Sequence, residues 1–232
     1  MGHKLSIVMP VFNETGTLEE ILKQVKAVDI GIEKEIILVD DCSTDGTREI
    51  LKKIEESDDE SIRVFFHGAN QGKGATLRTG FQHVTGDITI IQDADLEYNP
   101  QDYPKLIQPI LDDKADAVYG SRFMMARQHS LFSSYVANRV LTFLSNLFTQ
   151  LDLTDMETCY KVIKTSILQE IPLRSDRFGF EPEITAKLAK RKCRVVELPI
   201  TYRGREYHEG KTVSWKDGIA AIFHIIRFRL KD

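Results

Sequence analysis

Through the first half of the chain, short apolar runs alternate with segments in which apolar residues recur every three or four positions. The short runs predict buried strands at residues 5–11, 36–39, 62–66, 88–91 and 115–119. The periodic segments predict helices at residues 15–28, 44–54 and 73–84, and a further helix that starts at Asn99 and Pro100. Strands that alternate with helices in this way build a mostly parallel sheet with helices on both faces, so we expect an α/β fold.

Beyond Gly120 the pattern changes. A long helical stretch is predicted at residues 131–151, followed by a helix at 181–192, a strand at 194–202 and an amphipathic helix at 215–230. No internal repeat, low-complexity segment or long linker divides the chain. We therefore expect one domain over residues 1–212. The C-terminal amphipathic helix, residues 213–232, either belongs to this domain or lies at a membrane interface.

The composition is that of an ordinary globular protein. Of the 232 residues, 42% are hydrophobic and 28% are charged, which excludes disordered and fibrous classes. No apolar run reaches the roughly 20 residues of a membrane-spanning helix, and the N-terminus lacks the apolar region of a signal peptide. The three cysteines, Cys42, Cys159 and Cys193, form neither a paired framework nor a metal-ligand spacing. A reduced, cytoplasmic setting is expected.

Charge is distributed unevenly. Residues 1–186 hold 19 Lys and Arg against 30 Asp and Glu, whereas residues 187–232 hold 12 against 5. This basic end indicates contact with an anionic partner. A phosphate-bearing substrate or a membrane surface fits better than nucleic acid, because the basic residues lack interleaved aromatic residues and no nucleic-acid-binding motif occurs. A solvated basic face is the alternative.

The terminal helix has the composition of a helix that lies at a membrane surface. Its apolar residues are Ile219, Ile222, Phe223 and Ile226. They are followed at the end of the helix by the basic residues Arg227, Arg229 and Lys231. Together with the stretch 131–151 it predicts peripheral membrane binding. The alternative is that Ile219, Phe223 and Ile226 pack on the domain.

Carboxylates follow two of the predicted strands. Asp40 and Asp41 close the second strand, and Asp93-Ala94-Asp95 closes the fourth. Ligands of parallel sheets bind beyond the carboxyl ends of the strands. A divalent cation such as Mg²⁺ or Mn²⁺ relieves the repulsion between neighbouring carboxylates, and Asp95 with Glu97 could supply its protein ligands. An isolated D-x-D is more often a solvated turn, but here several such clusters converge on one sheet edge.

Two common nucleotide-binding motifs are absent from the expected places. The segment after the first strand, Pro10–Glu14, contains no glycine, which excludes a dinucleotide-binding G-x-G-x-x-G. The glycine-rich segment Gly68–Gly74 is one residue too short for a Walker loop and ends without Ser or Thr. It can still bring backbone close to a ligand.

The combined motifs resemble the family 2 glycosyltransferases of the GT-A fold. They are Val8–Glu14, Val39–Thr47, Asn70–Gly74, Asp93–Leu96 and Gly120–Arg122. Within that family, the chain is similar to the polyprenyl-phosphate hexose synthases, such as dolichyl-phosphate mannose or glucose synthase, over residues 4–212. The resemblance implies a GT-A (Rossmann-like) sheet with a nucleotide-sugar half at about 1–122 and an acceptor half at about 123–212.

The activity implied by the resemblance is a metal-dependent, inverting transfer of a hexose. The donor would be a nucleotide sugar, UDP-glucose or GDP-mannose, the acceptor a polyprenyl or dolichyl phosphate at the cytoplasmic membrane face, and the cofactor Mg²⁺ or Mn²⁺. Two alternatives stay open. One is transfer to a hydroxyl acceptor on a glycan or glycolipid, and the other is a catalytically silent nucleotide-sugar-binding protein.

The resemblance also implies roles for individual residues. The nucleotide sugar is expected at Pro10, Phe12, Glu14, Val39, Asp41, Lys73, Asp93, Ala94, Asp95, Arg203 and Lys211. The metal is expected at Asp95 and Glu97, and the acceptor phosphate at Arg122 and Ser134. The expected catalytic residues are Asp95, Arg122 and Asp155.

Several of these residues have a structural alternative. Asp155 could cap a helix instead of facing the acceptor together with Glu157, and the segment Tyr202–Lys211 could be a solvated loop. The acidic residues of Phe180–Glu183 favour a helix start, where the helix dipole stabilises negative charge. Ser130 stands where some relatives carry a basic residue, which departs from the family pattern.

Overall fold

The computed structural model describes residues 2–57, 59–125, 132–177, 179–204 and 215–230. The strands are β1 (Lys4–Val11), β2 (Glu33–Asp40), β3 (Ile62–Phe66), β4 (Ile88–Ile91), β5 (Ala117–Ser121), β6 (Lys161–Lys164) and β7 (Val195–Pro199). The helices are α1 (Leu18–Ala27), α2 (Thr47–Glu55), α3 (Lys73–Phe81), α4 (Tyr103–Leu111), α5 (Phe132–Thr149), α6 (Thr165–Glu170), α7 (Phe180–Lys190) and α8 (Trp215–Leu230), with a 3₁₀ turn, η1, at Pro100–Asp102.

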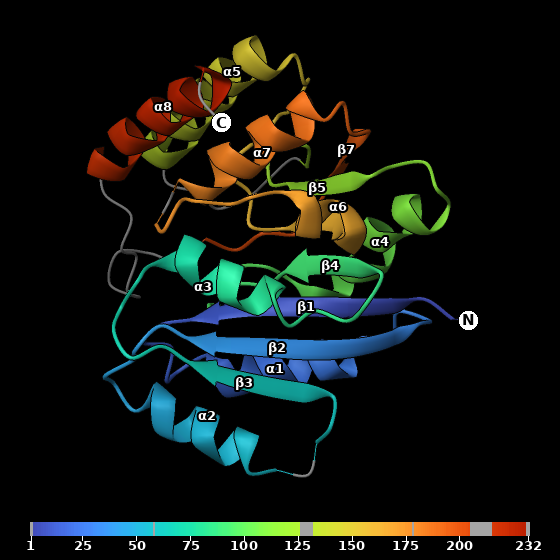
Figure 1. Ribbon diagram of the computed structural model, residues 1–232, viewed down its shortest axis with the longest axis vertical. Helices are drawn as coiled ribbons and strands as arrows, with labels where there is room; N and C mark the ends of the chain where they lie inside the picture. Colours follow the sequence, from blue (N-terminus) through green and yellow to red (C-terminus); the bar gives the residue numbers. More distant parts are fainter. Residues whose placement is uncertain (1, 58, 126–131, 178, 205–214, 231–232) are drawn as a thin grey trace.

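The strands form one seven-stranded, mostly parallel sheet in the order β3-β2-β1-β4-β6-β5-β7 (Figure 1). The fold class predicted from the sequence is therefore confirmed. Only β6 runs against its neighbours, pairing antiparallel with both β4 and β5. The sequence pattern missed β6 and α6, because a four-residue segment with a lysine at each end carries no periodic apolar signal.

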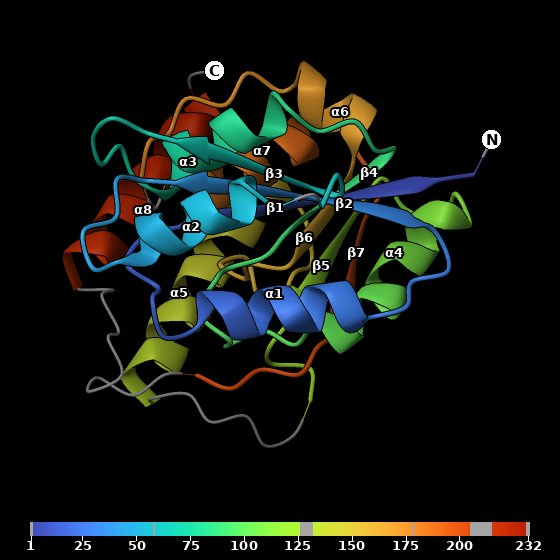
Figure 2. The ribbon, with the colours of Figure 1, turned by 90° about the horizontal axis from the view of Figure 1, so that it is seen from below.

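Helices cover the sheet on both sides. In Figure 2, α3, α6 and α7 lie on one face and α1, α4 and α5 on the other. The face of α1 that the apolar spacing predicted is buried, through Leu18, Ile21, Leu22 and Val25. The predicted helix at Asn99 and Pro100 begins as the turn η1, where the Asn99 side chain accepts a hydrogen bond from the backbone of Gln101.

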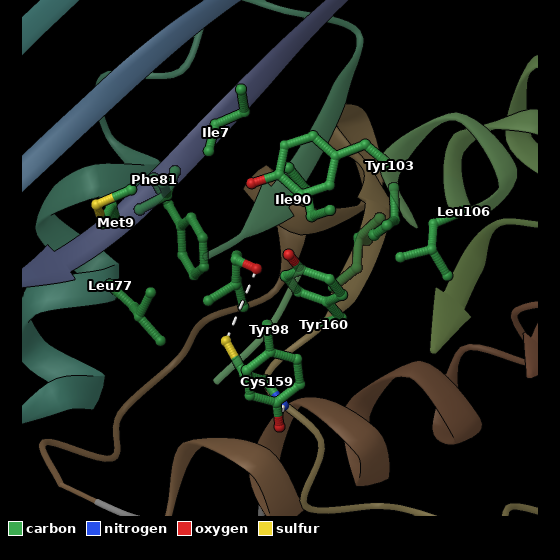
Figure 3. Close-up of a cluster of buried hydrophobic side chains, with 14 of the residues drawn as sticks. Ile7, Met9, Leu77, Phe81, Ile90, Tyr98, Tyr103, Leu106, Cys159 and Tyr160 are labelled. Carbon is green, nitrogen blue, oxygen red and sulfur yellow. Dashed lines mark hydrogen bonds between the residues drawn. The ribbon is translucent and has the colours of Figure 1, made fainter. Parts of the chain in front are cut away.

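A buried cluster of aromatic residues lies under the carboxyl end of β4 (Figure 3). Tyr103 and Tyr160 each donate a hydroxyl hydrogen bond to Oε1 of Gln92, at 2.5 and 2.7 Å. The hydroxyl oxygen of Tyr98 accepts from the backbone N–H of Cys159 at 3.0 Å. Because every polar group in these contacts has a partner, the loop after β4 rests on a rigid base.

The helices α5 and α8 lie side by side, and α8 packs against α7 as well (Figure 1). Ala221, Ile225 and Phe228 form the buried side of α8. The alternative that Phe223 and Ile226 pack on the domain is wrong, because they are 62% and 42% exposed. Ile219 has no described side chain.

On α5, four exposed apolar side chains follow the spacing of a single helical stripe: Val136, Val140, Phe143 and Leu147. We call these four residues, with Phe223 and Ile226, the α5–α8 apolar face. Within the described ranges, no helix combines the length and the hydropathy that crossing a membrane requires.

Candidate active site

The carboxyl ends of β1, β2, β3 and β4 meet at one edge of the sheet, as their parallel pairing requires. Backbone hydrogen bonds join the loops that follow: Asp41 N–H donates to Val11 O at 2.9 Å, and His67 N–H donates to Asp40 O at 2.8 Å. The clusters singled out in the sequence therefore share one edge, and the geometric prediction is confirmed.

Asp41 fastens the glycine-rich loop to this edge. Its buried carboxylate accepts hydrogen bonds from the backbone N–H groups of Gln71, at 2.9 Å, and Gly72, at 2.7 Å. A ring nitrogen of His67 lies 2.8 Å from the same carboxylate, and its other ring nitrogen lies 2.9 Å from the hydroxyl of Thr79. The sequence analysis missed His67, because nothing in its spacing points to Asp41.

Two glycines let this loop pack tightly against the chain before α7. Gly72 has a φ of +95°, which disfavours any other residue, and a Cβ there would lie 2.6 Å from the carbonyl oxygen of Asp176. A Cβ on Gly74 would clash with the carbonyl of Ser175. The loop is thus a close-packed helix entry, and Ala75 N–H donates to Asp176 O at 3.0 Å.

The predicted nucleotide-binding residues of β1 and β2 differ in how accessible they are. Phe12 is 46% exposed just past β1, and Pro10 is half-buried. Glu14 accepts a hydrogen bond from the hydroxyl of Thr17 at 2.7 Å, ahead of α1. Val39 is completely buried within β2. Of these four residues, Phe12 presents the most side-chain surface to a ligand.

Lys73, at the start of α3, joins two acidic groups from other elements. Its Nζ lies 2.9 and 3.0 Å from the two carboxylate oxygens of Asp93, and 3.4 Å from Oε1 of Glu181 on α7. Burial disfavours the charged ammonium, but the two carboxylates outweigh it and hold the pKa of Lys73 well above its usual value. Glu181 does lie in the first turn of α7, as predicted, and it also neutralises Lys73.

The loop after β4 is joined to the segment after β7. Glu97 accepts a hydrogen bond from the hydroxyl of Tyr202 at 2.9 Å, and its backbone oxygen accepts from the N–H of Arg203 at 2.9 Å. Within this loop, the carboxylate of Asp95 accepts a hydrogen bond from the backbone N–H of Glu97 at 3.1 Å, which stabilises the turn. Ala94 is buried between the two aspartates.

In the part of the chain that the structure describes, no three His, Cys, Asp or Glu side chains are grouped so that they could hold a metal ion. Mg²⁺ is usually held by one or two carboxylates together with substrate phosphates. The half-buried Asp95 and the neighbouring Glu97 offer oxygen donors of that kind. The donor set therefore fits a cation that reaches the site with a diphosphate.

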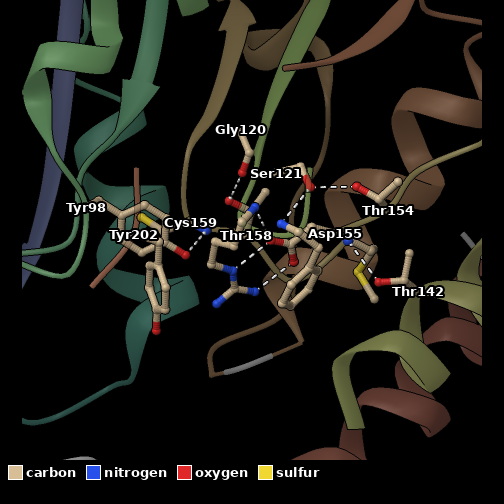
Figure 4. Close-up of polar contacts among 12 residues, drawn as sticks. Tyr98, Gly120, Ser121, Thr142, Thr154, Asp155, Thr158, Cys159 and Tyr202 are labelled. Atoms are coloured by element: carbon tan, nitrogen blue, oxygen red, sulfur yellow. Dashed lines mark hydrogen bonds and ion pairs between the residues drawn. The ribbon is translucent and has the colours of Figure 1, made fainter. Parts of the chain in front are cut away.

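Arg122, just past β5, is paired with Asp155. Figure 4 shows Asp155 in a network of polar contacts that includes Ser121 and Thr154. The Nε and Nη2 of Arg122 donate to the two carboxylate oxygens of Asp155, both at 2.7 Å, and its backbone N–H donates at 3.0 Å. Its guanidinium carbon lies 5.2 Å from the ring centre of Tyr202 and 5.5 Å from that of Phe123. The alternative that Asp155 caps a helix is wrong, because Asp155 lies in the loop between α5 and β6 and its carboxylate binds Arg122.

Some of the predicted site residues lie outside the described residues. Lys211 and Arg205 fall in the range 205–214, and Ser130 in the range 126–131. The side chain of Ser134, at the start of α5, is also not described. The proposed acceptor serine and the second basic residue of the diphosphate site therefore stay predictions.

The seven-stranded, mostly parallel sheet with helices on both faces, and with the D-x-D loop at its carboxyl edge, has the GT-A (Rossmann-like) fold of glycosyltransferases. The sequence model of "Glycosyl transferase family 2" matches residues 6–172, and the chain belongs to that family.

Relatives in sequence include undecaprenyl-phosphate 4-deoxy-4-formamido-L-arabinose transferases. That of Edwardsiella ictaluri (strain 93-146) is 30% identical over 209 residues, which cover 89% of this chain and 62% of the relative. That of Klebsiella pneumoniae subsp. pneumoniae is 30% identical over 210 residues, which cover 90% of this chain and 62% of the relative. The chain thus spans about three fifths of the length of these relatives.

Similar solved structures share the fold at low sequence identity. Glucosyl-3-phosphoglycerate synthase of Mycobacterium tuberculosis, in complex with Mn²⁺, UDP and phosphoglyceric acid, matches with a TM-score of 0.75 and 20% identity, over 99% of this chain and 78% of that one. Its complex with Mg²⁺ and UDP matches with a TM-score of 0.74 and 20% identity, over 99% of this chain and 79% of that one.

Proposed function

We propose that this protein is a metal-dependent, inverting glycosyltransferase that moves a hexose from a nucleotide sugar to a polyprenyl phosphate. The observation that carries the proposal is the arginine at the site: Arg122 is positioned by Asp155 and stacked on Tyr202, whose hydroxyl reaches the loop of Asp95 through Glu97. The names of the sequence relatives, which are undecaprenyl-phosphate transferases, support the same acceptor class.

The chemistry of a phosphate acceptor suits these residues. A phosphate monoester carries about −1.5 to −2 charges near pH 7, so it can attack an anomeric carbon without a base. What it needs is a cation that holds it beside an anionic donor, and a guanidinium matches phosphate geometry. Both oxygens of the Asp155 carboxylate bind Arg122, so we assign Asp155 as a positioning residue rather than a general base.

At the donor side, we propose that Asp95, with Glu97, holds Mg²⁺ or Mn²⁺. When bound there, the cation would stabilise the negative charge of the departing nucleotide diphosphate. Lys73 and Asp93 would border the diphosphate, Arg203 and Lys211 would close over it, and Phe12, Pro10, Glu14, Val39, Asp41 and Ala94 would surround the nucleoside. UDP-glucose and GDP-mannose are both candidate donors, and the UDP complexes of the fold neighbour make UDP the first to test.

The acceptor lipid implies a membrane surface. We propose that the α5–α8 apolar face inserts among lipid headgroups, with the exposed Arg139 and Arg227 on the same two helices attracting anionic lipids. The division into a nucleotide-sugar half, at about residues 1–122, and an acceptor half, at about residues 123–212, is part of this proposal.

Titration calorimetry followed by product analysis tests the proposal. We expect UDP or GDP to bind only with Mn²⁺ present, and the hexose to pass to polyprenyl phosphate but not to the corresponding polyprenol. Arg122→Lys keeps the charge but loses the two-pronged donor, so its kcat/KM with the phosphate acceptor should fall about 10²-fold or more while nucleotide affinity changes little. Arg194→Ala, at an exposed ion pair with Asp113 and Asp116, is the matched control.

Two results would contradict the proposal in different ways. Transfer to the polyprenol alone would favour a hydroxyl acceptor, and Glu157 would then be the acid to test as a base. Nucleotide binding without any product from either acceptor would favour a protein that binds nucleotide sugars without transferring them.

A further inference from the structure

One side chain contacts both the arginine proposed for the acceptor phosphate and a carboxylate proposed for the metal. Tyr202 follows β7, and its ring centre lies 5.2 Å from the guanidinium carbon of Arg122. Its hydroxyl group donates a hydrogen bond to Oε2 of Glu97 at 2.9 Å. The ring and the hydroxyl group therefore serve two different partners, which come from the loops after β5 and β4.

The surrounding chain fixes the place of Tyr202. Its backbone forms an antiparallel bridge with Tyr98, and the N–H of the preceding Thr201 donates to the Asp102 carboxylate at 2.7 Å. The rings of Tyr202 and Tyr98 pack edge to face with their centres 5.2 Å apart (Figure 4). Tyr98 is itself buried. Because Tyr202 is already held at its backbone and its ring, it loses little conformational freedom when it orients its neighbours.

On the acceptor side, the ring of Tyr202 supports the Arg122 guanidinium. Asp155 binds Nε and Nη2 of Arg122, and the cation lies over the Tyr202 ring. A cation in this place is attracted by the negative charge density on the face of the ring. Phe123 supplies a second ring at 5.5 Å, but it has no polar atom that could bind a group on the donor side.

On the donor side, the hydroxyl group of Tyr202 orients the carboxylate of Glu97. An ionised carboxylate only accepts hydrogen bonds, so the phenol is the donor. The phenol is neutral, and Glu97 therefore keeps its negative charge for a cation while its carboxylate is held in place. Hydrogen bonds of this kind to a metal-binding carboxylate are typically worth about 10- to 100-fold in metal affinity or activity.

We propose that Tyr202 is a positioning residue for both substrates: its ring orients Arg122 for the acceptor phosphate, and its hydroxyl group orients Glu97 for the donor metal. Both roles rest on the proposed function, which assigns Arg122 to the acceptor and Glu97 to the metal. Because the two contacts use different parts of one side chain, they can be removed separately.

Three substitutions separate the two contacts. Tyr202→Phe keeps the ring and removes the hydroxyl group, so the affinity for UDP with Mn²⁺ should fall about tenfold or more while the KM for polyprenyl phosphate stays unchanged. Phe123→Leu removes only a ring beside Arg122, so the acceptor KM alone should rise, by about twofold to fivefold. Tyr202→Leu removes both contacts and should show both effects. Calorimetry measures the UDP affinity, and steady-state kinetics at saturating donor measures the acceptor KM.

A double-variant cycle tests whether the donor effect acts through Glu97. In Glu97→Ala the hydroxyl group has already lost its acceptor, so adding Tyr202→Phe should change the UDP affinity by less than about twofold. A merely structural role of Tyr202 would give the same loss with and without Glu97. Tyr119→Phe is the matched control, because it removes a buried hydroxyl group that lies 2.9 Å from Thr185, and it should change neither quantity.

The outcomes are distinct. An unchanged UDP affinity in Tyr202→Phe, or an acceptor KM that rises in Tyr202→Phe as much as in Tyr202→Leu, would overturn the double role. If Tyr202→Leu does not fold, Tyr202→Phe and the cycle with Glu97→Ala still decide the matter. A wild-type protein that neither binds UDP with Mn²⁺ nor forms product would instead refute the proposed function, and the roles of Tyr202 would fall with it.

Discussion

Removing the carboxylate of Asp155 should destabilise the protein far more than a surface change. Asp155 is completely buried, and it accepts hydrogen bonds from Arg122 at 2.7, 2.7 and 3.0 Å. The Arg122 side chain is itself only 13% exposed. In Asp155→Ala the guanidinium would stay largely buried without a counter-charge, and breaking a buried pair in this way costs about 3–5 kcal/mol.

The size of this loss makes it easy to measure. Domains of this class are stable by about 5–15 kcal/mol, so Asp155→Ala should lose a large part of the free energy of unfolding. With about 2 cal/mol/K of unfolding entropy per residue, a loss of about 4 kcal/mol lowers the Tm of this chain by about 8 °C. Urea titration followed by circular dichroism gives the free energy, and calorimetry gives the Tm.

Two further variants separate the ion pair from simple side-chain loss. Asp152→Ala, at an exposed position of the same loop, should change stability by less than about 0.5 kcal/mol. The double variant Arg122→Met, Asp155→Leu removes both charges, so it should be markedly more stable than Asp155→Ala. An Asp155→Ala protein within about 1 kcal/mol of the wild type, or a double variant that loses the sum of the two single changes, would refute the reasoning.

Three other predictions follow from the described contacts. Asp95→Asn should lose Mn²⁺-dependent nucleotide binding and nearly all turnover while its Tm stays close to that of the wild type, and full activity, or full wild-type activity in EDTA, would contradict the metal proposal. Burial opposes ionisation of Glu35, but hydrogen bonds from Ser6 and Thr85 outweigh it and lower the pKa to about 2. The ionised Glu35 should therefore contribute about 3 kcal/mol to the free energy of unfolding above about pH 4.5, and this contribution should be lost as the pH falls towards 2. In Glu35→Gln the free energy of unfolding should depend less on pH in this acid range. Phe143→Asp should leave the fold intact, because Phe143 is 68% exposed, but it should reduce flotation of the protein with anionic vesicles about tenfold or more. The control Gln169→Asp, at an exposed position of α6, should not reduce flotation. Equal flotation of the two variants would rule out membrane binding through the α5–α8 apolar face.

Much of the sheet could be predicted from local pattern. The strands at residues 62–66 and 88–91 match β3 and β4 residue for residue, because apolar runs of that length between polar turns fit a buried strand. The helix predicted at 15–28 begins later, at Leu18. In the turn before it, the backbone oxygen of Glu14 accepts hydrogen bonds from the N–H groups of Thr17 and Leu18. Element boundaries depend on such local side-chain contacts, which apolar spacing does not report.

The antiparallel strand β6 depends on the tertiary structure. Its first residue, Lys161, is completely buried and would argue against a central strand in any sequence-based prediction. The fold supplies backbone oxygens from Met156 and Thr158 and the ring of Tyr119, at 4.8 Å, as partners for the ammonium. A charged residue can occupy a central strand only where its surroundings satisfy it. Here the carbonyl oxygens come from the loop just before β6, and the aromatic ring comes from the neighbouring strand β5.

For the site, the sequence alone determined which edge of the sheet would carry the chemistry. The carboxyl ends of parallel strands lie at the same edge of a sheet, so the carboxylates that follow β2 and β4 were expected at one edge. Only the tertiary structure decided which side chains pair: His67 with Asp41, Glu181 with Lys73, and Asp155 with Arg122. The strength of an ion pair depends on the distance between its atoms and on their removal from water, and neither quantity is a function of spacing along the chain.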